Sequence, residues 1–171
     1  MRTLVSGCAA ALVGVLTVMT AASAVADPAT LPVDPNVVTD STAYIAQQPI
    51  LDPNGQRGVE QTFTHRDGSR QITDTIVMLA DPQAAVASLE ANRSDAASMV
   101  VRQTSTPVPV GENGTVITGT SPDGSHAVTV LLFTRGATSA EIAFQGGPND
   151  PVPNDLVIDY GQRQDDAIQA G

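Results

Sequence analysis

The sequence predicts an α+β fold in which helices pack on an antiparallel sheet of about five strands. Two Asp-Pro pairs, at 34–35 and 81–82, are typical of helix starts, because aspartate can cap free backbone N–H groups and proline suits the first helical position. Turn signals at 67–68 (DG) and 121–124 (SPDG) each separate two segments that read as strands, a pattern typical of β-hairpins. A further strand and a last helix follow, so the predicted order is αββαβββα.

Residues 1–26 have the features of a secretory signal peptide. Arg2 precedes an apolar run over 8–19, which is too short to span a membrane but has the length of a signal's hydrophobic region. The AVA at 24–26 matches an A-x-A cleavage site, so we predict cleavage after Ala26. The alternative is a lipoprotein, because the VSGC at 5–8 fits a lipidation signal, although the apolar run follows this motif instead of preceding it.

Cleavage leaves 145 of the 171 residues. We expect 27–33 (DPATLPV) to form an extended, mobile lead because this segment is rich in proline, and we expect 34–171 to form a single α+β domain. The one cysteine of the chain, Cys8, is removed with the leader, so no disulfide can support this domain. Its stability must therefore come from a packed core, which a chain of this size can form.

The first helix is predicted to start at Asp34-Pro35 and to end before Pro49. Its apolar face has helical spacing and consists of Val37, Val38, Ser41, Tyr44 and Ile45. After a turn at 52–55, two strands are predicted at about 58–66 and 71–79. In the second of these strands Asp74 shares a face with the apolar residues Ile72, Ile76 and Met78.

The second helix is predicted over about 82–100, and Pro107 and Pro109 then keep the chain extended. Strands follow at 115–119, 126–135 and 139–145. The segment 127–133 (AVTVLLF) is the most hydrophobic part of the mature chain, so we expect it to be the central strand. Asn154 or Asp155 is expected to cap the last helix, in which Gly161 is predicted to weaken the middle by about 1 kcal/mol.

The C-terminal half contains loosely defined motifs: Val110-Gly111 before a strand, the SPDG hairpin, LLFTRGATSAEIAF at 131–144 and DLVIDYGQRQDDAI at 155–168. With the element order, they resemble small exported actinobacterial envelope proteins, rich in alanine and valine, with a Mog1/PsbP-like fold of the sensor or lipoprotein type. The likeness covers roughly residues 57 to 168. It implies an accessory, sensor or partner-binding module. The paired cysteines usual in sensor-type relatives are absent after cleavage, so we transfer no functional residue.

The composition argues against several classes of partner. All eight basic residues are arginines, and removal of Arg2 leaves seven of them against eighteen acidic residues. Such an acidic chain is repelled by nucleic-acid phosphates and by anionic membrane surfaces. With three Phe, two Tyr and no Trp, an aromatic platform for sugars or bases is not expected either.

The candidate catalytic residues are the two histidines, His65 and His126. Both lie beside predicted turns, where a solvated histidine is the simplest interpretation. Ser125 precedes His126, but adjacent residues of a strand point to opposite faces, so we expect no bond between these two side chains. A hydrolase using either histidine would need a Ser or Asp side chain within hydrogen-bonding reach in a cleft.

Two histidines without a mature cysteine cannot build a structural zinc site of the usual ligand set. The acidic loop residues lack the spacing of a calcium-binding EF-hand. The sequence therefore predicts no catalytic residue, no cofactor-binding residue, no metal ligand and no cofactor.

Three functional hypotheses remain open. The first is a secreted, non-catalytic binding or accessory module of the cell envelope, whose partner is an envelope or extracellular protein. The second is a carrier of an apolar small molecule or lipid, which requires an internal cavity of about 300 Å³ or more lined by aliphatic residues. The third is the hydrolase just described. All three place the mature protein outside the cytoplasm, without a nucleic-acid partner or a stable membrane anchor.

Overall fold

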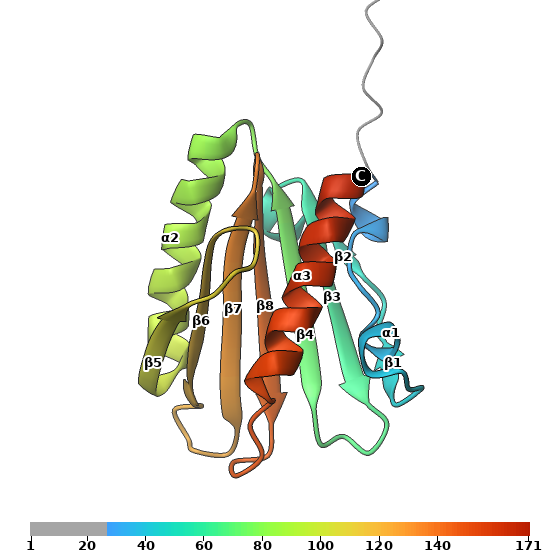
Figure 1. Ribbon diagram of the computed structural model, residues 1–171, viewed down its shortest axis with the longest axis vertical. Coiled ribbons are helices and arrows are strands. Elements are labelled where there is room, and N and C mark those ends of the chain that lie inside the picture. The colour runs from blue at the N-terminus through green and yellow to red at the C-terminus, as the bar shows by residue number, and fades with distance from the viewer. Residues whose placement is uncertain (1–26) are drawn as a thin grey trace, which may run out of the picture.

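The computed structural model describes residues 27–171, so the predicted leader and its cleavage site lie outside the described residues. The chain forms one antiparallel sheet with the strand order β1-β3-β4-β8-β7-β6-β5, and β2 also pairs with β3 (Figure 1). The strands are β1 (Tyr44–Ala46), β2 (Ile50–Leu51), β3 (Gly58–His65), β4 (Gln71–Met78), β5 (Val101–Pro107), β6 (Glu112–Thr120), β7 (Ala127–Arg135) and β8 (Thr138–Gly146). The helices are α1 (Pro35–Thr39), α2 (Pro82–Met99) and α3 (Asn154–Ala170). The predicted fold class is confirmed, but the sheet has eight strands instead of about five.

One of the additional strands, β1, replaces the second half of the predicted first helix, and another, β2, lies just beyond its predicted end at Pro49. Asp34 caps α1 as expected, since its side chain accepts from the backbone N–H of Asn36. The helix then ends at Thr39, because Asp40 adopts a left-handed conformation with φ +47°. The segment that follows extends as β1 along β3, so the helical spacing of Tyr44 and Ile45 predicted the wrong element.

Residues 27–33 were predicted to form an extended, mobile lead, but Leu31 and Val33 of this segment pack against the core. Pro28–Thr30 form a 3₁₀ turn, and the Leu31 side chain is only 4% exposed. The side chain of Gln164 on α3 accepts from the backbone N–H of Val33 at 2.8 Å and donates to the carbonyl of Leu31 at 2.8 Å. Tyr160, also on α3, donates its hydroxyl to the carbonyl of Val33 at 2.6 Å.

The third additional strand, β5, pairs with β6 at the edge of the sheet, where the sequence predicted only an extended passage. All seven of its residues are exposed. Arg102 lies in the left-handed region with φ +53°, where the register with β6 shifts. Such irregularities at an edge strand hinder pairing with another chain.

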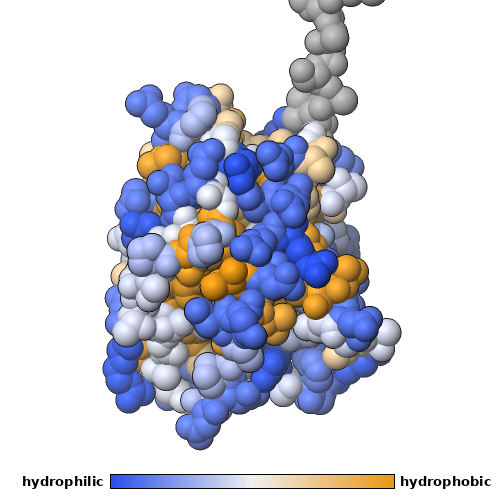
Figure 2. Space-filling model, in the orientation of Figure 1, coloured by the Kyte–Doolittle hydropathy of each residue, from blue (hydrophilic) through white to orange (hydrophobic). Residues whose placement is uncertain are grey.

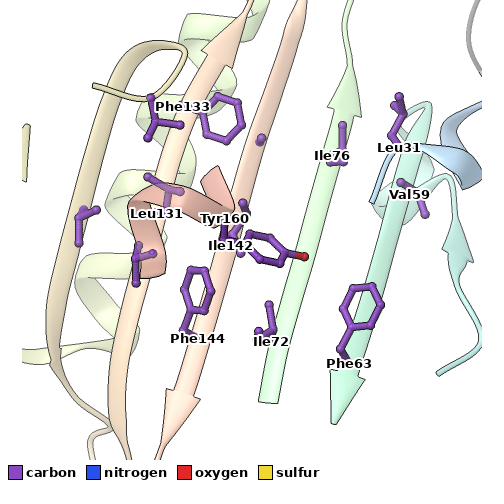
Figure 3. Close-up of a cluster of buried hydrophobic side chains, with 14 of the residues drawn as sticks. Leu31, Val59, Phe63, Ile72, Ile76, Leu131, Phe133, Ile142, Phe144 and Tyr160 are labelled. Atoms are coloured by element: carbon purple, nitrogen blue, oxygen red, sulfur yellow. The ribbon is translucent and has the colours of Figure 1, made fainter. Parts of the chain in front are cut away.

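The two faces of the sheet are covered by different helices. α2 packs on β7, β8 and β5 on one face, and α3 lies across the other face with α1 beside it (Figure 1). The α3 face holds the larger apolar cluster, in which Phe63, Phe133, Phe144 and Tyr160 take part (Figure 3). Seen from this side, hydrophobic residues gather in the middle of the face and hydrophilic ones surround them (Figure 2). A smaller cluster lies beneath α2, around Leu89 and Leu132.

The segment 127–133 lies inside the sheet as β7, although the middle of the strand order is β8. α2 begins as predicted, since the Asp81 side chain accepts from the N–H of Ala84 at 2.8 Å. The expected side-chain cap of α3 is wrong, because Pro153 occupies the cap position and neither Asn154 nor Asp155 stands there. None of the helices within 27–171 is long and apolar enough to cross a membrane.

The close packing of α3 on the sheet explains why glycine occupies position 161, although glycine has a low helix propensity. A Cβ atom at this position would lie 2.3 Å from a methyl group of Leu131 and 3.0 Å from one of Val110. The absence of a side chain therefore lets the middle of α3 approach β7 closely.

Candidate functional site

His65 stands at the end of β3 and is held by a short contact to the following turn. Its Nδ1 lies 2.5 Å from Oδ1 of Asp67, and its ring packs edge-on against Tyr44 at a centroid distance of 5.3 Å. His65 and Tyr44 line an open pocket of about 380 Å³, and Arg70 and Asp150, which form an ion pair at 2.6 Å, line it as well. His65 therefore has an acidic partner in a pocket.

The His65 pocket lacks one element of a hydrolase. Within residues 27–171, no serine or threonine hydroxyl is hydrogen-bonded to the imidazole of His65, although Ser41 and Ser69 line the pocket. A nucleophile is activated by contact with its base, so this geometry provides an oriented histidine without the second half of the pair.

His126 does contact Ser125, contrary to the expectation from strand alternation. The distance from Ser125 Oγ to His126 Nδ1 is 2.6 Å. The strand begins only at Ala127, so both residues lie in the turn and the alternation rule does not apply to them. Asp123 accepts from the hydroxyl of Ser125 at 2.7 Å, so the carboxylate contacts the serine instead of orienting the imidazole, as a catalytic triad requires. The three side chains are exposed at the tip of a hairpin.

The described residues contain no group of three or more His, Cys, Asp or Glu side chains that could hold a metal ion. The apolar region between α3 and the sheet, where a carrier would need its cavity, is occupied by side chains. Tyr160, Phe133, Phe144 and Leu131 are each at most 1% exposed there. The cleft that the carrier hypothesis requires between α3 and the sheet is therefore filled by side chains, which argues against this hypothesis.

A further concave surface lies on the other face of the sheet. A groove of about 550 Å³ runs between α2 and the half of the sheet formed by β3, β4 and β8. Glu60 on β3, Thr75 on β4 and Glu141 on β8 form one cross-strand row on its floor. Asp95 on α2 lines the wall. The remaining lining residues are Pro53, Asn54, Gln56, Val77, Ser88, Asn92, Ser98 and Met99. The lining thus carries three carboxyl groups and no basic side chain, and we call it the α2 groove.

Glu141 is the most perturbed of these carboxyl groups. Its pKa is raised to about 7, first because burial disfavours the charged form and then because Asp95 and Glu60 add negative charge nearby. A cation in the groove would favour the ionised form. No local pattern of the sequence brings Glu60, Asp95 and Glu141 to the same place.

A second unusual carboxyl group, that of Asp74, lies on the opposite face of the sheet. Asp74 faces Gln61 on β3 and Ile142 on β8, and it is 0% exposed. Neither of its carboxyl oxygens has a hydrogen-bond partner within residues 27–171, and burial raises its pKa well above the usual range. The sequence indicated this position, since Asp74 is the polar residue on an otherwise apolar face.

Comparisons with known proteins identify a similar fold. No protein-family model matches the chain, and no curated protein sequence matches it. The extracellular domain of PknH from Mycobacterium tuberculosis has a similar structure, with a TM-score of 0.62 over 84% of this chain and 95% of that domain. The sequence identity is 10%, so this likeness concerns the fold alone. The fold is thus similar to that of an actinobacterial extracellular domain. This agrees with the general part of the resemblance noted in the sequence, namely an exported actinobacterial protein.

Proposed function

We propose that this protein is a secreted, non-catalytic binding or accessory module of the cell envelope, and that the α2 groove is its binding surface. The observation that carries this proposal is the similarity in fold to an extracellular domain, which extends over 95% of that domain. A Mog1/PsbP-like family relationship, implied by the motifs in 57–168, belongs to the same proposal.

The packing of residues 27–33 on the folded domain supports export followed by cleavage after Ala26. Residues 27–33 run beside the C-terminal part of α3, and cleavage after Ala26 would make buried Leu31 the fifth residue of the mature protein (Figure 1). The mature chain would then begin almost at the folded body, without a long tether.

The α2 groove is suited to a protein partner that presents basic side chains. Its floor is a sheet surface beside α2. Glu60 and Glu141 lie on this floor, on the two strands that flank Thr75. Partly buried Glu141 is surrounded by further negative charge, which an arginine or lysine of the partner would offset. Exposed Met99 at the groove adds an apolar contact.

Non-catalytic action is proposed because neither histidine is part of a complete acid–base system. Asp67 faces His65 without a bonded hydroxyl nucleophile, and Asp123 contacts Ser125 instead of His126. No described contact therefore supplies both a nucleophile and an oriented base.

A photo-crosslinking experiment tests the groove. Ser98, which lines the groove, is replaced by a photo-crosslinking amino acid, and the protein is irradiated in envelope extract before mass spectrometry. We expect one specific protein to be crosslinked, and we expect the double substitution Glu60→Gln and Glu141→Gln to lower its yield at least tenfold.

The matched control removes two carboxylates from the other face of the molecule. Asp155→Asn with Asp166→Asn on α3 changes the net charge equally and affects exposed residues. Equal loss of crosslinking in both double variants would assign the effect to net charge and contradict binding in the groove.

Export has its own test, mass determination of the protein recovered outside the cytoplasm. We expect a chain that begins at Asp27. A product that begins with lipid-modified Cys8 would show that the protein is a lipoprotein, and this result would leave the groove experiment unaffected.

A further inference from the structure

Among residues 27–171, no hydrogen-bond donor is bonded to the carboxyl group of Asp74. Gln61, its neighbour across β3, donates its amide to the carbonyls of Gln47 and Thr62 at 2.8 and 3.0 Å. Tyr160 packs over the sheet with its hydroxyl directed toward β4, but that hydroxyl donates to Val33 (Figure 3). The two side chains best placed to satisfy the carboxyl group are therefore engaged elsewhere.

The groups around Asp74 also provide no compensating charge. β8 presents the apolar residues Ala140, Ile142 and Phe144 on this face. Tyr160 on α3, Tyr44 on β1 and Asp34 before α1 are the titratable groups of the same neighbourhood. Burial raises the pKa of both tyrosines above 10, so neither becomes charged between pH 4 and 7. The carboxyl group consequently remains protonated as long as α3 covers it.

α3 and residues 31–33 lie over Asp74, and a small number of polar contacts hold them in addition to the apolar packing of α3. Gln164 and Tyr160 join α3 to Leu31 and Val33, so the helix and residues 31–33 are bonded to each other. An ion pair between Arg135 and Asp165 ties α3 to the end of β7. We call α3 with residues 31–33 the α3 latch.

We propose that the α3 latch is a proton-controlled device: it closes over protonated Asp74 and opens from the sheet as Asp74 loses its proton to water. The proton leaves when solvent reaches the carboxyl group, and the ionised Asp74 then cannot be covered again without a large desolvation cost. Opening exposes the part of the sheet beneath α3, which is closed at acidic pH. This behaviour is a property of the protein alone and does not depend on a partner in the α2 groove.

The linkage between proton and opening gives a quantitative expectation. An opening that releases one proton becomes about tenfold more favourable for each pH unit, from the pKa of a solvated aspartate near 4 up to the raised pKa of the closed state. Amide hydrogen exchange of α3, corrected for the intrinsic dependence of exchange on pH, measures this opening. Between pH 4.5 and 6.5 we expect the protection of α3 amides to fall about a hundredfold, and at pH 6.5 it should be lower than the protection of β7 and β8.

Asp74→Asn tests the assignment, because asparagine has a similar shape and cannot ionise. In this variant we expect α3 protection to be independent of pH over the same range. Glu90→Gln, at an exposed position of α2 outside the groove, is the matched control and should keep the wild-type dependence in α3.

Two results would overturn the proposal. One is an unchanged pH dependence of α3 protection in Asp74→Asn. The other needs only the wild-type protein: equal protection of α3, β7 and β8 at every pH would mean that α3 opens only when the whole domain unfolds.

Discussion

The two faces of the sheet show how one helix can cover a wide sheet closely or only in part. On the face beneath α3, residues 31–33 and the Val110 loop add to the helix and close the surface over an aromatic core. On the face beneath α2, the helix packs on β7 and β8, and the neighbouring half of the sheet forms the floor of a groove. The closed face provides stability, and the open face provides a surface for a partner.

The difference between the faces is clearest in two carboxyl groups. Asp74 and Glu141 lie on neighbouring strands and point to opposite sides of the sheet, since Asp74 pairs with Ile142, the residue after Glu141. Burial raises the pKa of both. Asp74 is sealed, whereas Glu141 reaches a groove, so only the second can meet a ligand without a change of structure.

The largest effect on stability is expected from a substitution in the aromatic core beneath α3. Phe144 is 1% exposed and packs edge-on against Tyr160 at a centroid distance of 5.6 Å. Phe144→Ala should lower the free energy of unfolding by about 3–5 kcal/mol, because it removes buried contacts and leaves a cavity. Urea denaturation at pH 6 measures the change.

The control for this substitution lies at the open groove. Met99 is 49% exposed, so Met99→Ala should change the free energy of unfolding by less than about 0.5 kcal/mol. Similar losses in the two variants would remove the distinction between a closed and an open face.

The second effect is a gain in stability. The raised pKa of Asp74 means that the unfolded chain ionises first, so the contribution of Asp74 to stability is complete below pH 3.8 and is lost as pH rises toward the native pKa. Asp74→Asn removes this fall and should stabilise the protein by about 2–4 kcal/mol at pH 7, within the range of shifts known for fully buried acids.

The pH dependence distinguishes this mechanism from a simple packing effect. At pH 3 both states of the wild-type protein are protonated at Asp74, so wild type and variant should unfold at nearly the same urea concentration. A gain of equal size at pH 3 and pH 7 would contradict an origin in ionisation.

Glu141 should give a smaller effect of the same sign. Its stabilising contribution is complete below pH 4.5 and is lost as pH rises to about 7. Glu141→Gln should therefore raise the free energy of unfolding by about 1–2 kcal/mol at pH 8, less than the pKa alone suggests, because the groove is open to water. Thermal unfolding at pH 4 and pH 8 measures the gain, which should vanish at pH 4; a loss of stability at pH 8 would contradict the cause given for the raised pKa.

The parts of the fold that could be predicted from the sequence are those with local signals. The turn at 67–68 joins β3 and β4, and the turn at 121–124 leads into β7, so these three strands were placed to within a residue or two. β6, on the other side of the second turn, begins at Glu112, three residues earlier than predicted. β5 offered no such signal, because all of its residues are exposed and none alternates with a buried one. The end of α1 at the left-handed Asp40 was also not predictable, because the helical spacing of apolar residues continues beyond it in the sequence.

The candidate site depended on information that no local pattern contains. Asp74 was visible as a polar residue on an apolar face, but its lack of partners follows from the bonds that Gln61 and Tyr160 make elsewhere. The row of Glu60, Thr75 and Glu141 follows from the register of three strands, two of which, β4 and β8, are separated in the chain by 59 residues. The sequence patterns therefore lacked two kinds of information about the site: the register of strands that are distant in the chain, and the competition between side chains for hydrogen bonds.

The smallest effect concerns the bond that makes residues 31–33 part of the closed face. Tyr160→Phe removes the hydroxyl that donates to the carbonyl of Val33 but keeps the ring in the core. The expected loss is about 1 kcal/mol, the usual value for one partly buried hydrogen bond, since Gln164 still holds Val33 through its N–H. Limited proteolysis provides the second measurement, because a loosened 28–33 segment should be cleaved several times faster while α2 remains resistant. An unchanged rate of cleavage at 28–33 would mean that Gln164 and the buried side chain of Leu31 hold the segment without Tyr160, and the closure of this face would then depend on apolar packing more than on the bonds to α3.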